Sequence, residues 1–165
     1  MRAGRLFRHM LWPDWWVLRA FPVSALRTIE QAIAESERTH QGELRFVVEA
    51  GLPLPGLLRD QSPRARAIEL FAQLGVWDTE HNSGVLIYVQ LLDRSVEIVA
   101  DRGIDARVDD AFWSAVCRRM EAAFREGRFE SGTLLALNEI TQALAMYFPA
   151  SGENPDELPN TPLIR

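Results

Sequence analysis

The stretch GVLIYVQLLDRSVEIVA, residues 84–100, predicts two β-strands joined by a tight turn. Its first half, GVLIYVQL, is an almost continuous apolar run, which is typical of a central strand buried on both faces. Leu92, Asp93 and Arg94 then make a short return, and SVEIVA predicts a second strand. So short a connection makes the two strands antiparallel. A strand buried on both faces needs helices on both sides of its sheet, so this hairpin decides the fold class.

Helix and strand patterns alternate on the N-terminal side of the hairpin. Residues 24–39 carry apolar side chains at spacings of three and four, which predicts a helix. Residues 44–48 alternate between apolar and polar side chains, as in a half-buried strand. Ser62 and Pro63 form a helix start signal, and the helix they begin is expected to end at Gly75.

Two further helices are expected on the C-terminal side, from Asp109 or Asp110 to Glu126 and from about Ser131 to Tyr147. The order is helix, strand, helix, strand, strand, helix, helix. This order predicts a single α/β domain, a three-layer sandwich in which helices cover both faces of a mixed β-sheet.

The domain is expected to span residues 22–148, between two segments of different composition. Residues 1–21 form an arm rich in arginine and aromatic side chains, suited to packing on the domain or to touching a membrane surface or a partner. The tail 149–165 holds four of the nine prolines and has no periodicity, so it is predicted to be disordered.

Composition excludes several classes of protein. The 18 basic and 23 acidic side chains give a formal net charge of −5, and no basic stripe is present, which argues against a nucleic-acid surface. A single cysteine rules out an internal disulfide. No run approaches the roughly 18 apolar residues of a membrane span, and the N-terminus lacks the pattern of a secretory signal. We therefore expect a cytoplasmic protein without a transmembrane segment.

The strong catalytic motifs are also missing from the sequence. It has no glycine-rich nucleotide loop, no HExxH, no CxxC and no GxSxG. Cys117 lies in an apolar helical run and is expected in the core rather than as a nucleophile. The three histidines (His9, His40 and His81) are far apart in polar or terminal context, and we expect them to be solvent-exposed.

An acidic segment follows the hairpin, IVADRGIDARVDDAFW at residues 98–113. It contains four aspartates: Asp101, Asp105, Asp109 and Asp110. A crossover helix makes the strands at 44–50 and 84–91 parallel, so Asp101 should lie at the same sheet edge as Glu43. The other three aspartates come from the loop and helix start that follow.

These five acids allow two interpretations. Hard oxygen ligands gathered from loops suit Ca²⁺ or Mg²⁺, and clustered like charges favour a cation that neutralises them. Alternatively, Asp109 or Asp110 is a helix N-cap and Asp101 a turn residue that bonds the local backbone. The opposite edge of the sheet, where open α/β sheets usually bind ligands, offers Asp60 and Asp93 as a rival site.

The hairpin and its surroundings resemble the TPM domain, a family named after a thylakoid lumen protein, a photosystem II repair factor and a nematode receptor modulator. NSGVLIYVQLLDRSVEIVADRGI, residues 82–104, is similar to the family signature of an N-G-V-L-type strand, a D-R turn, an alternating strand and a final Gly before Leu or Ile. GELRFVVEA, FAQLGVWDT and FREGRFESGTLLALNEI also resemble their counterparts, the last through Gly127 and Gly132. The resemblance extends over roughly residues 22–147.

This resemblance, closest to short unanchored bacterial members, implies an α/β sandwich, divalent metal binding in some members and acid phosphatase activity in a plant member. It also implies roles in the assembly or repair of membrane complexes. Our leading hypothesis is a non-enzymatic accessory domain that binds a divalent cation and supports a membrane-associated protein partner, peripheral to the inner membrane. The alternatives are a metal-dependent acid-phosphatase-like hydrolase and a purely structural domain without metal.

Overall fold

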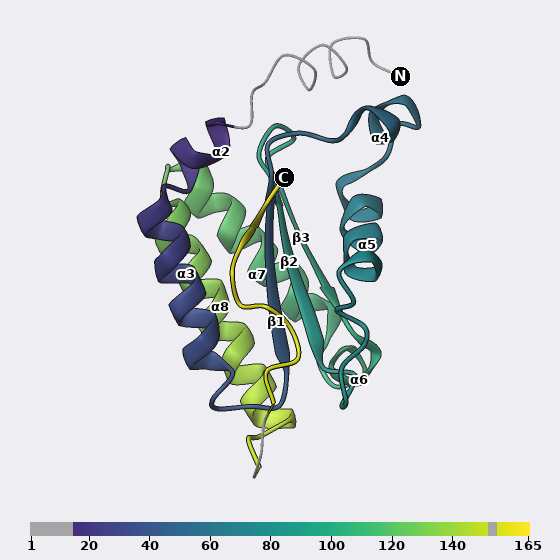
Figure 1. The fold of residues 1–165 in the computed structure, drawn as a ribbon, viewed down its shortest axis with the longest axis vertical. Coiled ribbons are helices and arrows are strands. Elements are labelled where there is room, and N and C mark those ends of the chain that lie inside the picture. The colour runs from purple at the N-terminus through teal and green to yellow at the C-terminus, as the bar shows by residue number, and fades with distance from the viewer. Residues whose placement is uncertain (1–14, 152–154) are drawn as a thin grey trace.

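The computed structural model describes residues 15–151 and 155–165, which form one mixed sheet with helices on both faces (Figure 1). The strand order is β3-β2-β1-β4. The strands are β1 (Glu43–Glu49), β2 (Gly84–Gln90), β3 (Ser95–Ala100) and β4 (Leu163–Ile164). β1 runs parallel to β2 and β4, and β2 pairs antiparallel with β3. The predicted three-layer α/β sandwich is confirmed.

The helices divide between the two faces of the sheet (Figure 1). One face is covered by α2 (Trp15–Ala20), α3 (Val23–Ser36), α7 (Asp110–Arg125) and α8 (Phe129–Tyr147). The other face is covered by α5 (Pro63–Gln73). Two short helices, α4 (Leu54–Leu58) and α6 (Arg102–Asp105), lie in connections and were not predicted. Each spans only about one turn, which is too short to produce a recognisable apolar period.

Each face of the sheet has its own hydrophobic core, because side chains alternate along a strand. Phe46, Val48 and Ile87 pack with α3, α7 and α8, whereas Val47 and Leu86 pack with α5. The prediction of a half-buried strand at 44–48 was wrong: every residue of β1 is buried. The charged side chains of β1 are covered by α5 and by residues 155–165, which supply hydrogen-bond partners for Glu43, Arg45 and Glu49.

Two glycines of the family-like signature are required by close backbone contacts. A Cβ on Gly84 would lie 2.0 Å from the carbonyl oxygen of Val76, in the loop that leads from α5 to β2. A Cβ on Gly103 would lie 2.5 Å from the carbonyl oxygen of Asn82 and 2.6 Å from that of His81. At Gly103 the absence of a side chain lets its N–H donate to the carbonyl oxygen of Asn82 at 2.9 Å, which joins the start of α6 to the loop before β2.

The C-terminal segment is ordered against the sheet where the sequence predicted disorder. We define it as residues 155–165, the described part of the tail. Leu158 is buried in the core on the α5 side, and Leu163–Ile164 extend the sheet beside β1. The guanidinium of Arg45 donates to the carbonyl oxygens of Pro159 and Thr161. The apolar residues of this segment are irregularly spaced, so they carry no periodic signal in the sequence. Their role becomes visible only in the structure, where they lie beside β1.

Most of the predicted N-terminal arm, residues 1–14, lies outside the described residues. The rest of the arm packs on the domain: Val17 and Phe21 are fully buried, whereas Trp15 is 61% exposed. Among the helices described, none combines the length and apolar composition needed to cross a bilayer.

Candidate metal site

The edge of the sheet where β1 and β2 begin collects the predicted ligands Glu43 and Asp101. Glu43 is in register with Gly84, and the backbone N–H of Asp101 donates to the carbonyl oxygen of Gly84 at 2.8 Å. The two acids are therefore separated by one intervening strand. This agrees with the topology inferred from the crossover rule.

Asp101 serves as the N-cap of α6. Its Oδ1 accepts a hydrogen bond of 2.7 Å from the N–H of Arg102, whose side chain donates to Asn82 Oδ1 at 3.1 Å. The residue is buried, with 8% of its surface exposed, and its Oδ2 has no hydrogen-bond partner among the described residues. Asp101 thus fulfils the turn role considered from the sequence while leaving one oxygen unused.

The other three aspartates lie in exposed positions on or beside helices. Asp109 is the N-cap of α7 and accepts from the N–H of Ala111 at 2.9 Å. Asp110 occupies the first turn of that helix, where a negative charge is favoured by the helix dipole. Asp105 lies in the single turn of α6. Capping explains Asp109, and metal binding by these three residues stays a prediction.

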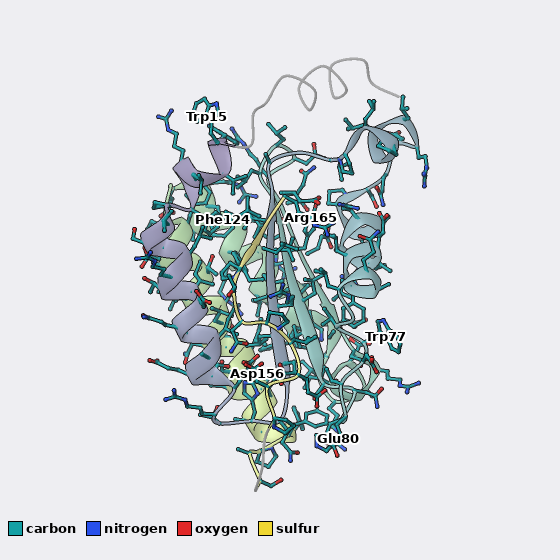
Figure 2. All side chains as sticks on the ribbon, in the orientation of Figure 1. Trp15, Trp77, Glu80, Phe124, Asp156 and Arg165 are labelled. Atoms are coloured by element: carbon teal, nitrogen blue, oxygen red, sulfur yellow. The ribbon has the colours of Figure 1, made fainter. Side chains whose placement is uncertain are left out.

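A group of three carboxylates forms around Glu43 instead. Within residues 15–151 and 155–165, only Glu37, Glu43 and Asp156 form a group of three acidic, histidine or cysteine side chains with ligand atoms within 4.8 Å of one another. Glu37 is the C-cap residue of α3, Glu43 begins β1, and Asp156 belongs to the C-terminal segment. Figure 2 shows Asp156 near the end of the sheet where β1 begins. The group therefore joins three separate parts of the chain.

Burial changes the electrostatics of this group. The pKa of Glu37 is raised to about 8, chiefly by burial and in part by the negative charges of Glu43 and Asp156, against a hydrogen bond from the N–H of Leu44. Burial likewise raises the pKa of Glu43 to about 7, although its Oε2 accepts from the N–H of Leu158 at 3.2 Å. At neutral pH protons therefore remain on part of the group.

The donor set fits a hard divalent cation. Three carboxylates supply oxygen ligands of the kind that Ca²⁺ and Mg²⁺ prefer, and the clustered acids lower their mutual repulsion by binding a cation. Binding would displace the protons held by Glu37 and Glu43, so affinity should rise with pH. A bound cation would supply charge neutralisation and connect the C-terminal segment to α3 and β1.

Sequence reasoning found one member of this group and missed two. Glu37 lies at the polar end of an amphipathic helix, where a charged residue is ordinarily solvated. Asp156 belongs to a proline-rich tail that carries no periodic pattern. The available signal was the placement of Glu37 and Glu43 on either side of a short turn, which brings a helix end and a strand start together.

His40 is fully buried, and the expectation that it is solvent-exposed was wrong. Its Nδ1 accepts from the N–H of Gly42 at 3.2 Å, so Nε2 carries the proton and donates to Ser36 Oγ at 2.7 Å. The hydroxyl of Ser36 donates to Thr141 Oγ1 at 2.7 Å, and the hydroxyl of Thr141 donates to the carbonyl oxygen of Leu137. Burial lowers the pKa of His40 to about 4, so the ring is neutral at neutral pH and connects Ser36, at the end of α3, with Gly42.

Cys117 has the properties of a packed thiol, as the sequence predicted. It is half-buried on α7, and burial raises the pKa of its thiol to about 11, with the charge of nearby Glu97 adding to the effect. A thiol that stays protonated at neutral pH is a poor nucleophile.

The opposite edge of the sheet, where β1 and β2 end, carries a buried ion pair between Glu49 and Arg66. Glu49 accepts from Arg66 Nη2 at 2.6 Å and from the hydroxyl of Tyr88 at 2.8 Å, and all three side chains are buried. The guanidinium of Arg66 also bonds Glu69 at 3.1 Å. The rival ligands Asp60 and Asp93 lie in the loops at this edge, outside the three-carboxylate group.

Comparison with known proteins assigns the chain to a family. The family model of the TPM domain matches residues 20–143. The chain belongs to the TPM domain family. Among solved structures, it is similar to the NMR structure of BA42 from the psychrophilic bacterium Bizionia argentinensis, with 30% identity, a TM-score of 0.77, and coverage of 88% of this chain and 95% of that one.

A second solved structure supports the fold. The N-terminal domain of a protein from P. gingivalis, solved by solution NMR, is 17% identical with a TM-score of 0.65, and the match covers 86% of this chain and 94% of that chain. At that identity the likeness concerns the fold alone. No curated protein matches the chain at a significant level.

Proposed function

We propose that this TPM domain is a non-catalytic accessory module of the cytoplasm that binds a divalent cation, Ca²⁺ or Mg²⁺, and supports a protein partner at the inner membrane. The observation that carries the proposal is the convergence of Glu37, Glu43 and Asp156 from three separate segments. A cation there would hold the C-terminal segment on the domain without a reacting group nearby.

Two of the described side chains, those of His40 and Cys117, support the non-catalytic part. His40 is neutral, buried and engaged at both ring nitrogens, and Cys117 keeps its proton at neutral pH because burial raises its pKa. Neither offers the activated nucleophile or accessible base that hydrolysis without metal requires.

The partner-binding part is supported by apolar side chains at one end of the molecule. α2 and α4 lie at the same end in Figure 1, and Trp15 projects there in Figure 2. Trp15, Leu18, Leu54 and Leu58, which lie on these two helices, are among the exposed large hydrophobic residues. Apolar side chains at one end of a domain are typical of a protein or membrane contact.

Thermal unfolding of the full chain tests the cation site. Millimolar Ca²⁺ or Mg²⁺ should raise the melting temperature of the wild type relative to a chelator, because the cation binds only the folded arrangement. Glu43→Gln and Asp156→Asn should reduce the rise strongly, whereas Asp78→Asn, at an exposed aspartate outside every candidate site, serves as the matched control. An equal rise in all variants would refute this site, and a rise lost only in Asp101→Asn or Asp110→Asn would assign the cation to the acidic segment.

Co-sedimentation with vesicles containing phosphatidylglycerol tests the apolar end. The double variant Trp15→Ala/Leu18→Ala should lose sedimentation, and Leu135→Ala is the matched control because this α8 residue is also exposed. Equal sedimentation of all three proteins would remove α2 from the proposal.

A further inference from the structure

The edge of β1 is covered by the chain's own C-terminal segment. The N–H of Arg165 donates to the carbonyl oxygen of Val48 at 3.0 Å, and the N–H of Ala50 donates back to Arg165 at 3.3 Å. Leu163 contacts the core on the α5 side and Ile164 contacts the core on the α3 side. The segment therefore occupies a strand position that the sheet would otherwise present as an edge.

The C-terminal segment pairs with the sheet through far fewer residues than β1 does. β1 pairs with β2 along all seven of its residues, but β4 pairs with β1 through two. Leu158 is the single buried residue of the C-terminal segment, whereas every residue of β1 is buried. Opening the segment would expose β1 while leaving the rest of the sheet paired, and open strand edges readily accept another strand.

One side chain of the segment is poorly matched to the surface it covers. Asp156 brings a third carboxylate to within 4.8 Å of Glu37 and Glu43. Its charge adds to the repulsion that raises the pKa of both glutamates. A strand with a cationic residue at this position would complement the two buried carboxylates instead of opposing them.

We propose that the edge of β1 is a strand-docking site, and that an extended strand of a partner protein displaces the C-terminal segment from it. The partner strand runs parallel to β1 and carries apolar side chains at the positions of Leu158, Leu163 and Ile164, with a basic residue at that of Asp156. Strand addition of this kind draws affinity from backbone hydrogen bonds and specificity from alternate side chains. The inference deepens the proposed function by naming its partner surface, and it does not require the cation.

A fluorescent peptide of residues 155–165 tests the exchange on the full-length protein in chelator. In the wild type the tethered segment competes with the peptide, so the apparent affinity is reduced by the fraction of open protein. The full-length variant Leu158→Ala/Leu163→Ala weakens only the tethered segment and should bind the peptide at least roughly tenfold tighter. A peptide with Asp156→Lys should gain roughly a further tenfold at pH 8.5, from one charge-assisted contact.

Two controls make the result decisive. A peptide with Leu158→Asp and Ile164→Asp should not bind, and the protein variant Leu135→Ala should behave as the wild type. Equal peptide affinity for the wild type and the weakened variant would overturn the inference. A full-length dimer that dissociates on adding the peptide would assign the site to a second copy and would overturn the partner strand.

Hydrogen exchange on the wild type keeps the test independent of variant folding. The amides of Leu158 and Arg165 should exchange at least tenfold faster than those of β2, because the segment opens locally. Exchange of these amides only with global unfolding would show that the segment is not displaceable. Because every measurement is made in chelator, failure of the cation site would leave the outcome unchanged.

Discussion

Acidification should destabilise the fold through His40. The ring is fully buried, its Nδ1 accepts from Gly42, and burial lowers its pKa from the ordinary 6.5 to about 4. Protonation would place an N–H at Nδ1 opposite the N–H of Gly42 and would bury an unpaired charge. In the unfolded chain the same ring takes up a proton at its ordinary pKa, so acid favours the unfolded state.

The magnitude follows from the difference between the two pKa values. The contribution of His40 is fully present above pH 6.5 and is lost as the pH falls toward 4. A group with this difference removes ~3 kcal/mol of unfolding free energy between pH 7 and pH 4. The total stability of a domain is ~5–15 kcal/mol, so this loss is a large share of it.

Urea unfolding followed by tryptophan fluorescence at pH 7, 6, 5 and 4 measures the effect. The full-length His40→Gln variant is the comparison, because it cannot titrate at this position and keeps every other acid and base of the chain. It should be less stable than the wild type at pH 7, and the gap should shrink by ~3 kcal/mol at pH 4. A gap that stays constant to within ~0.5 kcal/mol across this range would refute the neutral, buried assignment of His40.

Three further predictions concern the carboxylate group, the signature glycine and catalysis. In chelator the contribution of Glu37 to the unfolding free energy should fall as the pH rises from 5 through 8, because its raised pKa makes that contribution greatest in acid. Glu37→Gln removes this contribution, so the difference in unfolding free energy between the wild type and this variant should shrink over the range, and a cation should stabilise the wild type more at pH 8.5 than at pH 6. Gly84→Ala should lower the unfolding free energy by at least ~3 kcal/mol, because the added methyl group would lie 2.0 Å from a carbonyl oxygen. Gly75→Ala, where the methyl group would meet no other atom but φ is +67°, should lower it by only ~1 kcal/mol, and chemical denaturation measures both variants. Hydrolysis of p-nitrophenyl phosphate with Mg²⁺ or Ca²⁺ should stay at the background rate; activity that Asp101→Asn or Glu43→Gln abolishes would replace the non-catalytic proposal with the hydrolase alternative.

The hairpin and the parallel pairing could be derived from local patterns and one topological rule. A continuous apolar run, a three-residue return and a crossover helix between two strands leave little freedom in the sheet, so Glu43 and Asp101 were placed at one edge correctly. The N-caps of α5 and α7 were also recognisable, because Ser62 and Asp109 satisfy backbone N–H groups in their own helices. Such contacts involve residues close in sequence.

The composition of the carboxylate group depended on contacts between residues far apart in the chain. Glu43 meets the C-terminal segment through a hydrogen bond that spans more than a hundred positions. The sequence does not show whether a carboxylate faces water or another buried acid. Its charge state depends on the surroundings that the side chain acquires on folding. Asp156 and Glu37 therefore became candidates only once the strands had brought their segments together.

The sequence by itself determined the longer helices of this TPM domain, the strands β1, β2 and β3, their order and the pairing of these three strands, because periodicity, caps and turn lengths act over a few residues. Tertiary structure alone decided which side chains lose contact with water. It buried His40 and all of β1, gave the tail a strand to pair with, and set three acids side by side. Desolvation and like-charge repulsion arise only when distant segments pack, so the candidate cation site and the strand-docking edge belong to the fold.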